Sequence, residues 1–229
     1  MDGSQLRSAT WERYAWAGGV VFVLALLAES VVAVGIGLTH QASAATIATG
    51  LHAHEQRLIV IACISVVYAV AFVLYLWKLY GLLRGDPARP NDLSTLVLVG
   101  GVLFVTLHAV SDIGITGMLG ARVASYSAAH DPGLAFSLYY LTYALDSVAD
   151  VFGSLAFLAA GLLIVRTGDL PRRLGWVAIV TAPFLLLQAF GLGGVIASFG
   201  LALDLVGFLL LLVFVAATSV AGYRVASSR

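Results

Sequence analysis

The sequence predicts an all-α, polytopic transmembrane helical bundle of about six spans with both termini in the cytoplasm. Of its 229 residues, 61% are hydrophobic and only 10% are charged, whereas soluble domains average about half apolar and a quarter charged residues. Six stretches are apolar enough to cross a hydrocarbon core, which takes about 20 helical residues. The Lys and Arg residues lie almost entirely on one side of these stretches.

The spans follow one another without an intervening linker, since no Ser/Pro-rich or charge-rich stretch divides the chain. We therefore expect residues 1–229 to form a single transmembrane domain. Residues 91–94 supply helix-capping side chains before the third span, and Gly168 with Pro171 closes the fourth. No charge marks the boundary between the fifth and sixth spans. The expected spans are residues 15–38, 58–83, 94–119, 135–165, 174–190 and 201–223.

The orientation of the spans follows from the distribution of basic residues, because Lys and Arg near span ends stay in the cytoplasm. Only Arg57 and Arg122 fall on one side of the expected spans. The other side carries Arg7, Arg13, Lys78, Arg84, Arg89, Arg166, Arg172, Arg173, Arg224 and Arg229. This asymmetry predicts cytoplasmic termini and places the connections 39–57, 120–134 and 191–200 outside. The first connection is long enough for a short interfacial helix.

One cytoplasmic connection carries a family resemblance. Its stretch Arg-Thr-Gly-Asp-Leu-Pro-Arg-Arg-Leu-Gly-Trp, residues 166–176, resembles a loop in a bacterial membrane family known only as a domain of unknown function, with the pattern R-S-G-x-L-P-R-x-L-G. Ala28-Glu29, the Ala/Thr-rich residues 42–49 and Arg57 follow in a similar order. The sequence departs from the family at Thr167, where serine is usual, and in lacking an acidic residue in the second span. The resemblance implies a multi-pass protein of the bacterial cytoplasmic (inner) membrane.

Ionisable residues within the expected spans are the main functional signal, because each is costly to place at bilayer depth. Glu29 comes late in the first span, which runs outward, and Asp204 lies just inside the start of the sixth. The others are His108, Asp112, Asp146 and Asp150 in the third and fourth spans. All six favour the outer half of the bundle, so we expect a polar cavity near the external face.

Helical spacing groups these residues, because residues three, four or seven apart share a helix face. The fourth span carries one stripe and the third span a second. The stripe on the fourth span consists of Tyr139, Tyr143, Asp146 and Asp150. The stripe on the third span consists of His108, Ser111, Asp112 and Ile115. Close carboxylates repel one another at low dielectric, so they need protonation, a bound cation, or pairing with Arg57 or Arg122.

The candidate ligand-binding residues are Glu29, His108, Asp112, Tyr139, Tyr143, Asp146 and Asp150. His108, Asp112, Asp146 and Asp150 could instead hold a divalent metal, since imidazole and carboxylate are common metal ligands. Candidate catalytic residues are Glu29, Asp112 and Asp146, with the cofactor otherwise unknown. The alternative for each residue is an interhelical hydrogen bond that holds the bundle together.

Three functions fit these residues. The first is binding or transport of a cation, proton or amphiphilic small molecule in the outer cavity. The second is an intramembrane enzyme, metal-dependent or acid-catalysed, that acts on a lipid or isoprenoid-like substrate. The third is an accessory subunit of a membrane complex. The expected partners are membrane lipid, a small hydrophobic or cationic ligand and further copies of the chain, but no nucleic acid, because no basic run is present.

Overall fold

The computed structural model describes residues 3–36, 42–85, 91–191 and 200–227, with backbone alone for residues 3–13, 118–121, 191, 200–204 and 227. These residues are almost entirely helical, which confirms the all-α prediction. The elements are α1 (Gly3–Ala33), α2 (Ala44–Ala53), α3 (Glu55–Leu83), α4 (Asp92–Ala109), the π-helix η1 (Val110–Gly120), α5 (Ala121–Ala129), α6 (Pro132–Thr167), α7 (Arg172–Gly191) and α8 (Gly200–Ser227).

Six segments of the described chain are long and apolar enough to cross a membrane: Tyr14–Ala33, Glu55–Leu83, Asp92–Gly117, Pro132–Thr167, Arg172–Phe190 and Leu205–Ala226. They agree in number and order with the six expected spans. The first is shorter than predicted, because α1 ends at Ala33 and not at residue 38. The predicted connection 191–200 lies mostly outside the described residues.

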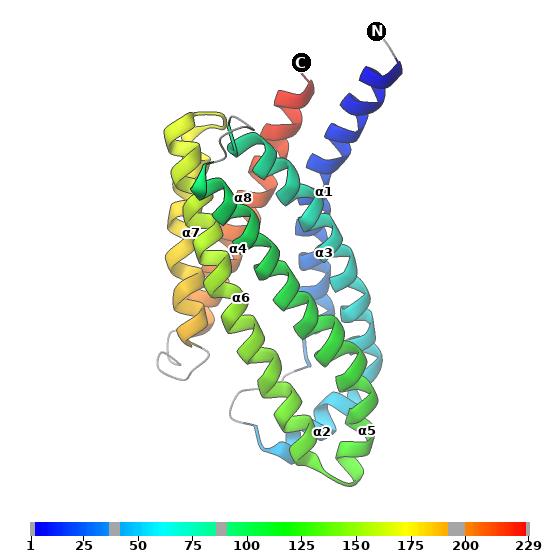
Figure 1. The fold of residues 1–229 in the computed structure, drawn as a ribbon. Coiled ribbons are helices and arrows are strands. Elements are labelled where there is room, and N and C mark those ends of the chain that lie inside the picture. The colour runs from blue at the N-terminus through cyan, green and yellow to red at the C-terminus, as the bar shows by residue number, and fades with distance from the viewer. Residues whose placement is uncertain (1–2, 37–41, 86–90, 192–199, 228–229) are drawn as a thin grey trace.

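The spans pack as a closed ring in the order α1, α3, α4, α6, α7 and α8, with α8 returning to contact α1. Both termini lie at one end of the bundle, which we call the termini end, together with the α3–α4 and α6–α7 connections (Figure 1). Helices α2 and α5 lie at the opposite end. Helix α2 confirms the short helix expected in the connection 39–57, whereas α5 fills the connection 120–134, where none was predicted.

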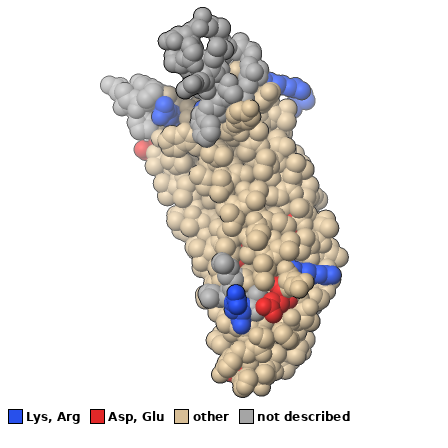
Figure 2. Space-filling model, turned by 90° about the vertical axis from the view of Figure 1, so that its right-hand side faces the viewer, with Lys and Arg blue, Asp and Glu red and all other residues tan. Residues whose placement is uncertain are grey.

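The surface matches a membrane-spanning bundle. Large apolar side chains such as Leu24, Val70 and Leu209 are exposed on its outside, and such side chains suit a lipid solvent. In Figure 2, the charged side chains gather near the top of this face and in its lower third, and a broad, almost uncharged zone separates the two groups. The aromatic residues Trp77 and Trp176 are both more than half exposed and lie toward the termini end, as expected of an interfacial aromatic belt.

Aromatic side chains fill the centre of the ring in the half nearer the termini. Phe157 of α6 packs on Phe214 of α8 with ring centroids 5.1 Å apart, and Phe72 packs on Tyr75 at 5.8 Å. The buried hydroxyls of Tyr75 and Thr218 are hydrogen-bonded at 2.7 Å and so join α3 to α8 across the ring. This half of the bundle is a packed core.

We expect Tyr75→Phe to lower the free energy of unfolding by about 1 kcal/mol, the usual net contribution of one buried hydrogen bond. The loss is limited because the Thr218 hydroxyl also donates to the Phe214 carbonyl oxygen. Unfolding of the purified protein by sodium dodecyl sulfate measures the change. Thr218→Val provides the matched removal of the other partner. If the hydrogen bond is the cause, the double variant loses less than the sum of the two single losses.

The third span is not the regular α-helix that the range 94–119 predicts. After Ala109 the chain continues for 11 residues as the π-helix η1, which contains Asp112. π-helical turns are rare and often occur at functional sites. Gly117 of η1 packs so closely on Ala62 of α3 that a side chain at residue 117 would collide with the Ala62 methyl group. This close approach fixes η1, and the Asp112 that it carries, against α3.

Candidate functional site

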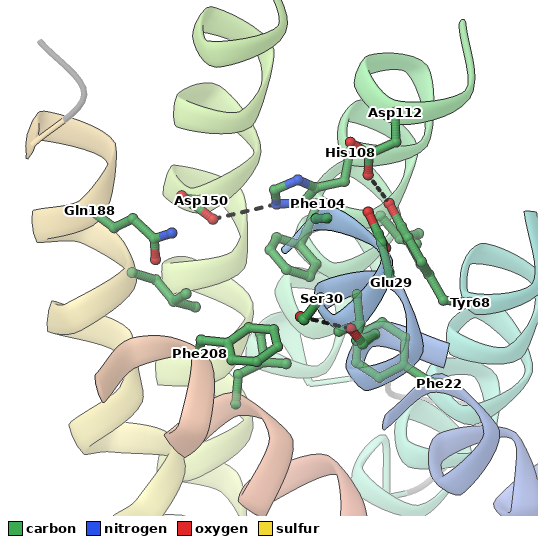
Figure 3. Close-up of a pocket in the computed structure, with 15 residues that line it drawn as sticks. Phe22, Glu29, Ser30, Tyr68, Phe104, His108, Asp112, Asp150, Gln188 and Phe208 are labelled. Carbon is green, nitrogen blue, oxygen red and sulfur yellow. Dashed lines mark hydrogen bonds and ion pairs between the residues drawn. The ribbon is translucent and has the colours of Figure 1, made fainter. Parts of the chain in front are cut away.

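A cavity of about 290 Å³ occupies the ring in the half farther from the termini. All six spans contribute to its wall, and most of the lining is apolar. Its polar members come mainly from α1, α3, α4, η1 and α6 (Figure 3). The lining residues are Phe22, Leu26, Glu29, Ser30, Ala33, Tyr68, Phe104, Val105, His108, Asp112, Asp150, Leu185, Gln188, Phe208 and Leu211. The cavity therefore lies in the half of the bundle where the sequence predicts a polar site.

The imidazole of His108 lies between two carboxylates of α6. Its Nδ1 is 3.1 Å from Asp146 Oδ1, and its Nε2 is 3.4 Å from Asp150 Oδ1. The two aspartates are four residues apart and so share a face of α6, as the sequence predicts. A neutral imidazole has only one N–H. It can donate to both carboxylates only as an imidazolium, and otherwise one of the two carboxyls carries the proton.

Asp112 bonds to α3 and not to the stripe on α6. The hydroxyl of Tyr68 donates to Asp112 Oδ2 at 2.5 Å. Tyr68 is buried and lines the cavity, although it was not among the candidate residues that the sequence predicts. Ser111, beside Asp112, donates to the Thr142 carbonyl oxygen and ties η1 to α6.

Two carboxylate oxygens at the cavity have no hydrogen-bond partner among the described residues, although both are buried: Glu29 Oε2 and Asp150 Oδ2. Asp150 as a whole is only 3% exposed. Figure 3 shows the Glu29 carboxyl beside Tyr68 and Asp112. A buried carboxylate oxygen without a donor is unfavourable by several kcal/mol. The cavity is therefore arranged to receive hydrogen-bond donors or positive charge.

Neither Arg57 nor Arg122 compensates these acids within the described part of the chain. Arg57 donates from Nη1 to the Val34 carbonyl oxygen at 3.1 Å, beyond the end of α1. Arg122 is exposed on α5 and, within the described part of the chain, forms no ion pair with the cluster. The cavity lining described here holds no Lys or Arg. His108 is thus the one basic side chain that the structure places among Glu29, Asp112, Asp146 and Asp150, and pairing with the arginines is not the solution.

The predicted tyrosines of α6 lie outside the cavity lining. The hydroxyls of Tyr139 and Tyr143 are 2.7 Å apart, and their rings meet edge to face at 4.9 Å. Tyr139 packs on the small apolar cluster of α2, α5 and α6 around Ile47. Although both tyrosines share a stripe with Asp146, they lie one to two helical turns farther from the termini end. The structure does not bring them to the site.

Most of the other lining residues have no functional signal of their own in the sequence. Phe22, Phe104 and Phe208 come from three different spans and resemble the other apolar residues of their runs, and Gln188 is a lone amide near the end of α7. The ring of Phe104 meets the His108 ring edge to face at 4.7 Å. Since Phe104 and His108 are four residues apart, helical spacing could have linked these two.

The geometry does not favour a metal centre. His108 already has both ring nitrogens directed at carboxylates. In the described part of the chain, no three His, Cys, Asp or Glu side chains are arranged to hold one metal ion. The predicted ligands His108, Asp112, Asp146 and Asp150 do lie in one region, but they pair with protein groups. The side chain of Asp204, a further acid that the sequence singled out, lies outside those described.

Comparison of the chain with protein-family models, with curated proteins and with solved structures finds no match in any of the three. The function of the site must therefore be inferred from its geometry. One imidazole lies among four carboxyl groups beside a largely apolar cavity, and two of these carboxyl groups have a buried oxygen without a partner among the described residues.

Proposed function

We propose that the protein is a binding or transport protein of the bacterial cytoplasmic membrane whose outer cavity receives a cation, a proton or an amphiphilic small molecule. The observation that carries this proposal is the pair of unpartnered, buried oxygens on Glu29 and Asp150. They lie on different spans, yet both residues line the same cavity. The excess of basic residues at the termini end assigns that end to the cytoplasm, so the ligand arrives from the external side.

The charge balance of the site supports a positively charged guest. Four carboxyls face one imidazole, and charges interact strongly where the dielectric is low. A protonated His108 offsets one carboxylate, and every further ionised carboxyl raises the electrostatic free energy of the empty site. Protons or a cation relieve that repulsion. Because both compete for the same oxygens, a cation that binds should displace protons into the solvent.

We expect a cation to stabilise the purified, full-length protein, since a ligand that binds only the folded state at 100 times its Kd adds about 2.7 kcal/mol to the free energy of unfolding. Melting temperature in detergent, measured across inorganic and organic cations, detects this effect. A weakly buffered solution with a pH indicator detects the protons released on binding. Asp150→Asn and Asp112→Asn should abolish or strongly reduce both signals.

Asp169→Asn is the matched control, because Asp169 is exposed in the connection between α6 and α7 at the termini end. This variant should keep the full response. Equal cation affinity in the wild type, Asp150→Asn and Asp112→Asn would contradict the proposal, as would a protein that no cation stabilises and that releases no protons.

An intramembrane enzyme is the alternative that one observation favours. The cavity places carboxyl groups against apolar walls that include Phe22, Phe104 and Phe208, a setting that suits a lipid or isoprenoid-like substrate and a carboxyl acting as general acid. Incubation of the protein with a membrane lipid extract, followed by mass spectrometry, distinguishes the two functions. Conversion of a lipid that stops with Glu29→Gln would favour the enzyme, whereas unchanged lipids with cation binding favour the binding protein.

A further inference from the structure

We infer that the cavity is built for an organic ammonium ion, a ligand with a positively charged nitrogen that carries N–H donors on an apolar body. This inference deepens the proposed function and rests on it, because it names the class of cation. It draws on three features of the cavity: the acceptors, the apolar wall and the volume.

The acceptors come from three spans. Glu29 of α1 and Asp150 of α6 each offer a buried oxygen that no described group engages, and Asp150 is almost fully buried. Gln188 of α7 also lines the cavity, and Figure 3 shows its side chain extending toward the cavity. A primary ammonium has three N–H donors and no acceptor. Two carboxyl groups and one amide carbonyl group in the wall are acceptors of the kind that it needs.

A bare metal ion fits these acceptors less well. Mg²⁺ requires about six oxygen ligands in near-octahedral geometry and Ca²⁺ requires six to eight. The described residues contain no cluster of acidic or imidazole side chains arranged for a metal, and His108 and Tyr68 already occupy one oxygen each of Asp150 and Asp112. An ammonium ion needs fewer ligands, because it has only three N–H donors to satisfy.

The remaining wall is apolar and suits a hydrocarbon body. Phe22 and Leu26 of α1 face the cavity together with Leu185 of α7 and Phe208 of α8. A small hydrated cation would leave this surface in contact with water, whereas an apolar group would cover it and gain roughly 25 cal/mol for each Å². Phenylalanine rings also attract a nearby cation by the cation–π effect. The wall therefore favours a cation with an apolar part.

The volume and the opening are consistent with such a ligand. A cavity of about 290 Å³ lies at the lower end of the range for small-molecule sites, and it is about ten times the volume that one water molecule occupies in the liquid, roughly 30 Å³. That space holds a compact amphiphile and not a whole phospholipid. Ser30 lines the cavity and is exposed, so the cavity is open at Ser30 and not fully enclosed.

The test compares four probes on the purified, full-length protein in detergent by isothermal titration calorimetry. The probes are 4-phenylbutylammonium, its neutral counterpart 4-phenylbutanol, ammonium chloride and sodium chloride. We expect 4-phenylbutylammonium to bind roughly tenfold or more tightly than each of the others, because a hydrogen bond to a charged group contributes about 1.5–3 kcal/mol. The alcohol controls for partition of the phenylbutyl group into the detergent micelle.

Variants assign the binding to the cavity. Glu29→Gln and Asp150→Asn should each weaken 4-phenylbutylammonium binding roughly tenfold or more, and Phe208→Ala should weaken it without changing the response to ammonium chloride. Glu29→Gln leaves the His108 contacts intact, so it keeps the test valid if Asp150→Asn does not fold. Asp169→Asn serves again as the control with full affinity.

Each outcome separates this inference from the proposed function. If ammonium or sodium bound as tightly as 4-phenylbutylammonium, and Asp150→Asn abolished that binding, the organic-ammonium inference would be wrong. The proposed cation site would still stand. Equal binding of 4-phenylbutanol, unaffected by Glu29→Gln, would overturn the inference by showing that charge is not recognised. Binding of none of the four probes, together with no proton release and no stabilisation by any cation, would overturn both.

Discussion

His108→Phe is expected to lower the free energy of unfolding by about 3 to 5 kcal/mol, the usual effect of removing one partner from a buried ion pair. Phenylalanine keeps the ring volume and the edge-to-face contact with Phe104. It removes the N–H groups that face Asp146 and Asp150. Two carboxyls four residues apart on α6 then face each other's charge without the imidazole between them.

A charge-compensated variant isolates the electrostatic part of this loss. The triple variant His108→Phe, Asp146→Asn, Asp150→Asn removes the imidazole together with both carboxylates, so it should recover most of the lost stability. Unfolding by sodium dodecyl sulfate, followed by circular dichroism, compares the three proteins. A single variant as stable as the wild type, or a triple variant less stable than the single one, would show that His108 does not hold a charged cluster together.

Gly161→Val is expected to lower the free energy of unfolding by about 3 kcal/mol, the upper end of the 1–3 kcal/mol that overpacking a tight contact commonly costs. A Cβ atom at residue 161 of α6 would lie 2.6 Å from the Gly175 carbonyl oxygen and 2.7 Å from Ile179 Cγ1. The first of these is a backbone atom of α7. The two helices would have to move apart, whereas small residues at membrane helix crossings normally allow the two backbones to approach closely.

Gly81→Val is the matched control for this prediction. Gly81 is also within a helix, but a Cβ there would meet no heavy atom within 4 Å among those described. The control should change stability by less than about 1 kcal/mol, in line with small differences in helix propensity. Melting temperature in detergent measures both variants. Equal loss in the two variants would mean that the close approach of α6 and α7 is not what Gly161 provides.

Much of the fold can be predicted from the sequence, because it depends on local properties such as the length of an apolar run. An apolar run of sufficient length forms a helix in lipid whatever it packs against, and so all six spans are found in the right order. Even α2, between two spans, follows from a connection too long for a turn. The π-helix η1 is different. Its hydrogen bonding depends on how Gly117 packs against Ala62 of α3, and no local pattern encodes that contact.

The site can be predicted from the sequence only where two of its residues share a helix face. Asp146 and Asp150 lie four apart, and both contact His108, as two facing stripes would allow. Tyr139 and Tyr143 follow the same spacing but lie outside the cavity lining, because periodicity gives the face of a helix but not the height at which a cavity ends. Partners across the ring, such as Tyr68 with Asp112, depend on helix rotation set by packing.

The proposed cation site requires that Glu29 and Asp150 line one cavity and that a cation binds their oxygens, which no described group engages. Reaction of the membrane-embedded protein with an apolar carbodiimide, read out by peptide mass spectrometry, tests it most directly, because this reagent modifies carboxyl groups that it reaches from an apolar phase. We expect the reagent to modify Glu29 or Asp150, and this modification should fall when 4-phenylbutylammonium or another binding cation is present. The proposed site would be wrong if both residues were modified and no cation reduced that modification. It would also be wrong if neither residue were modified.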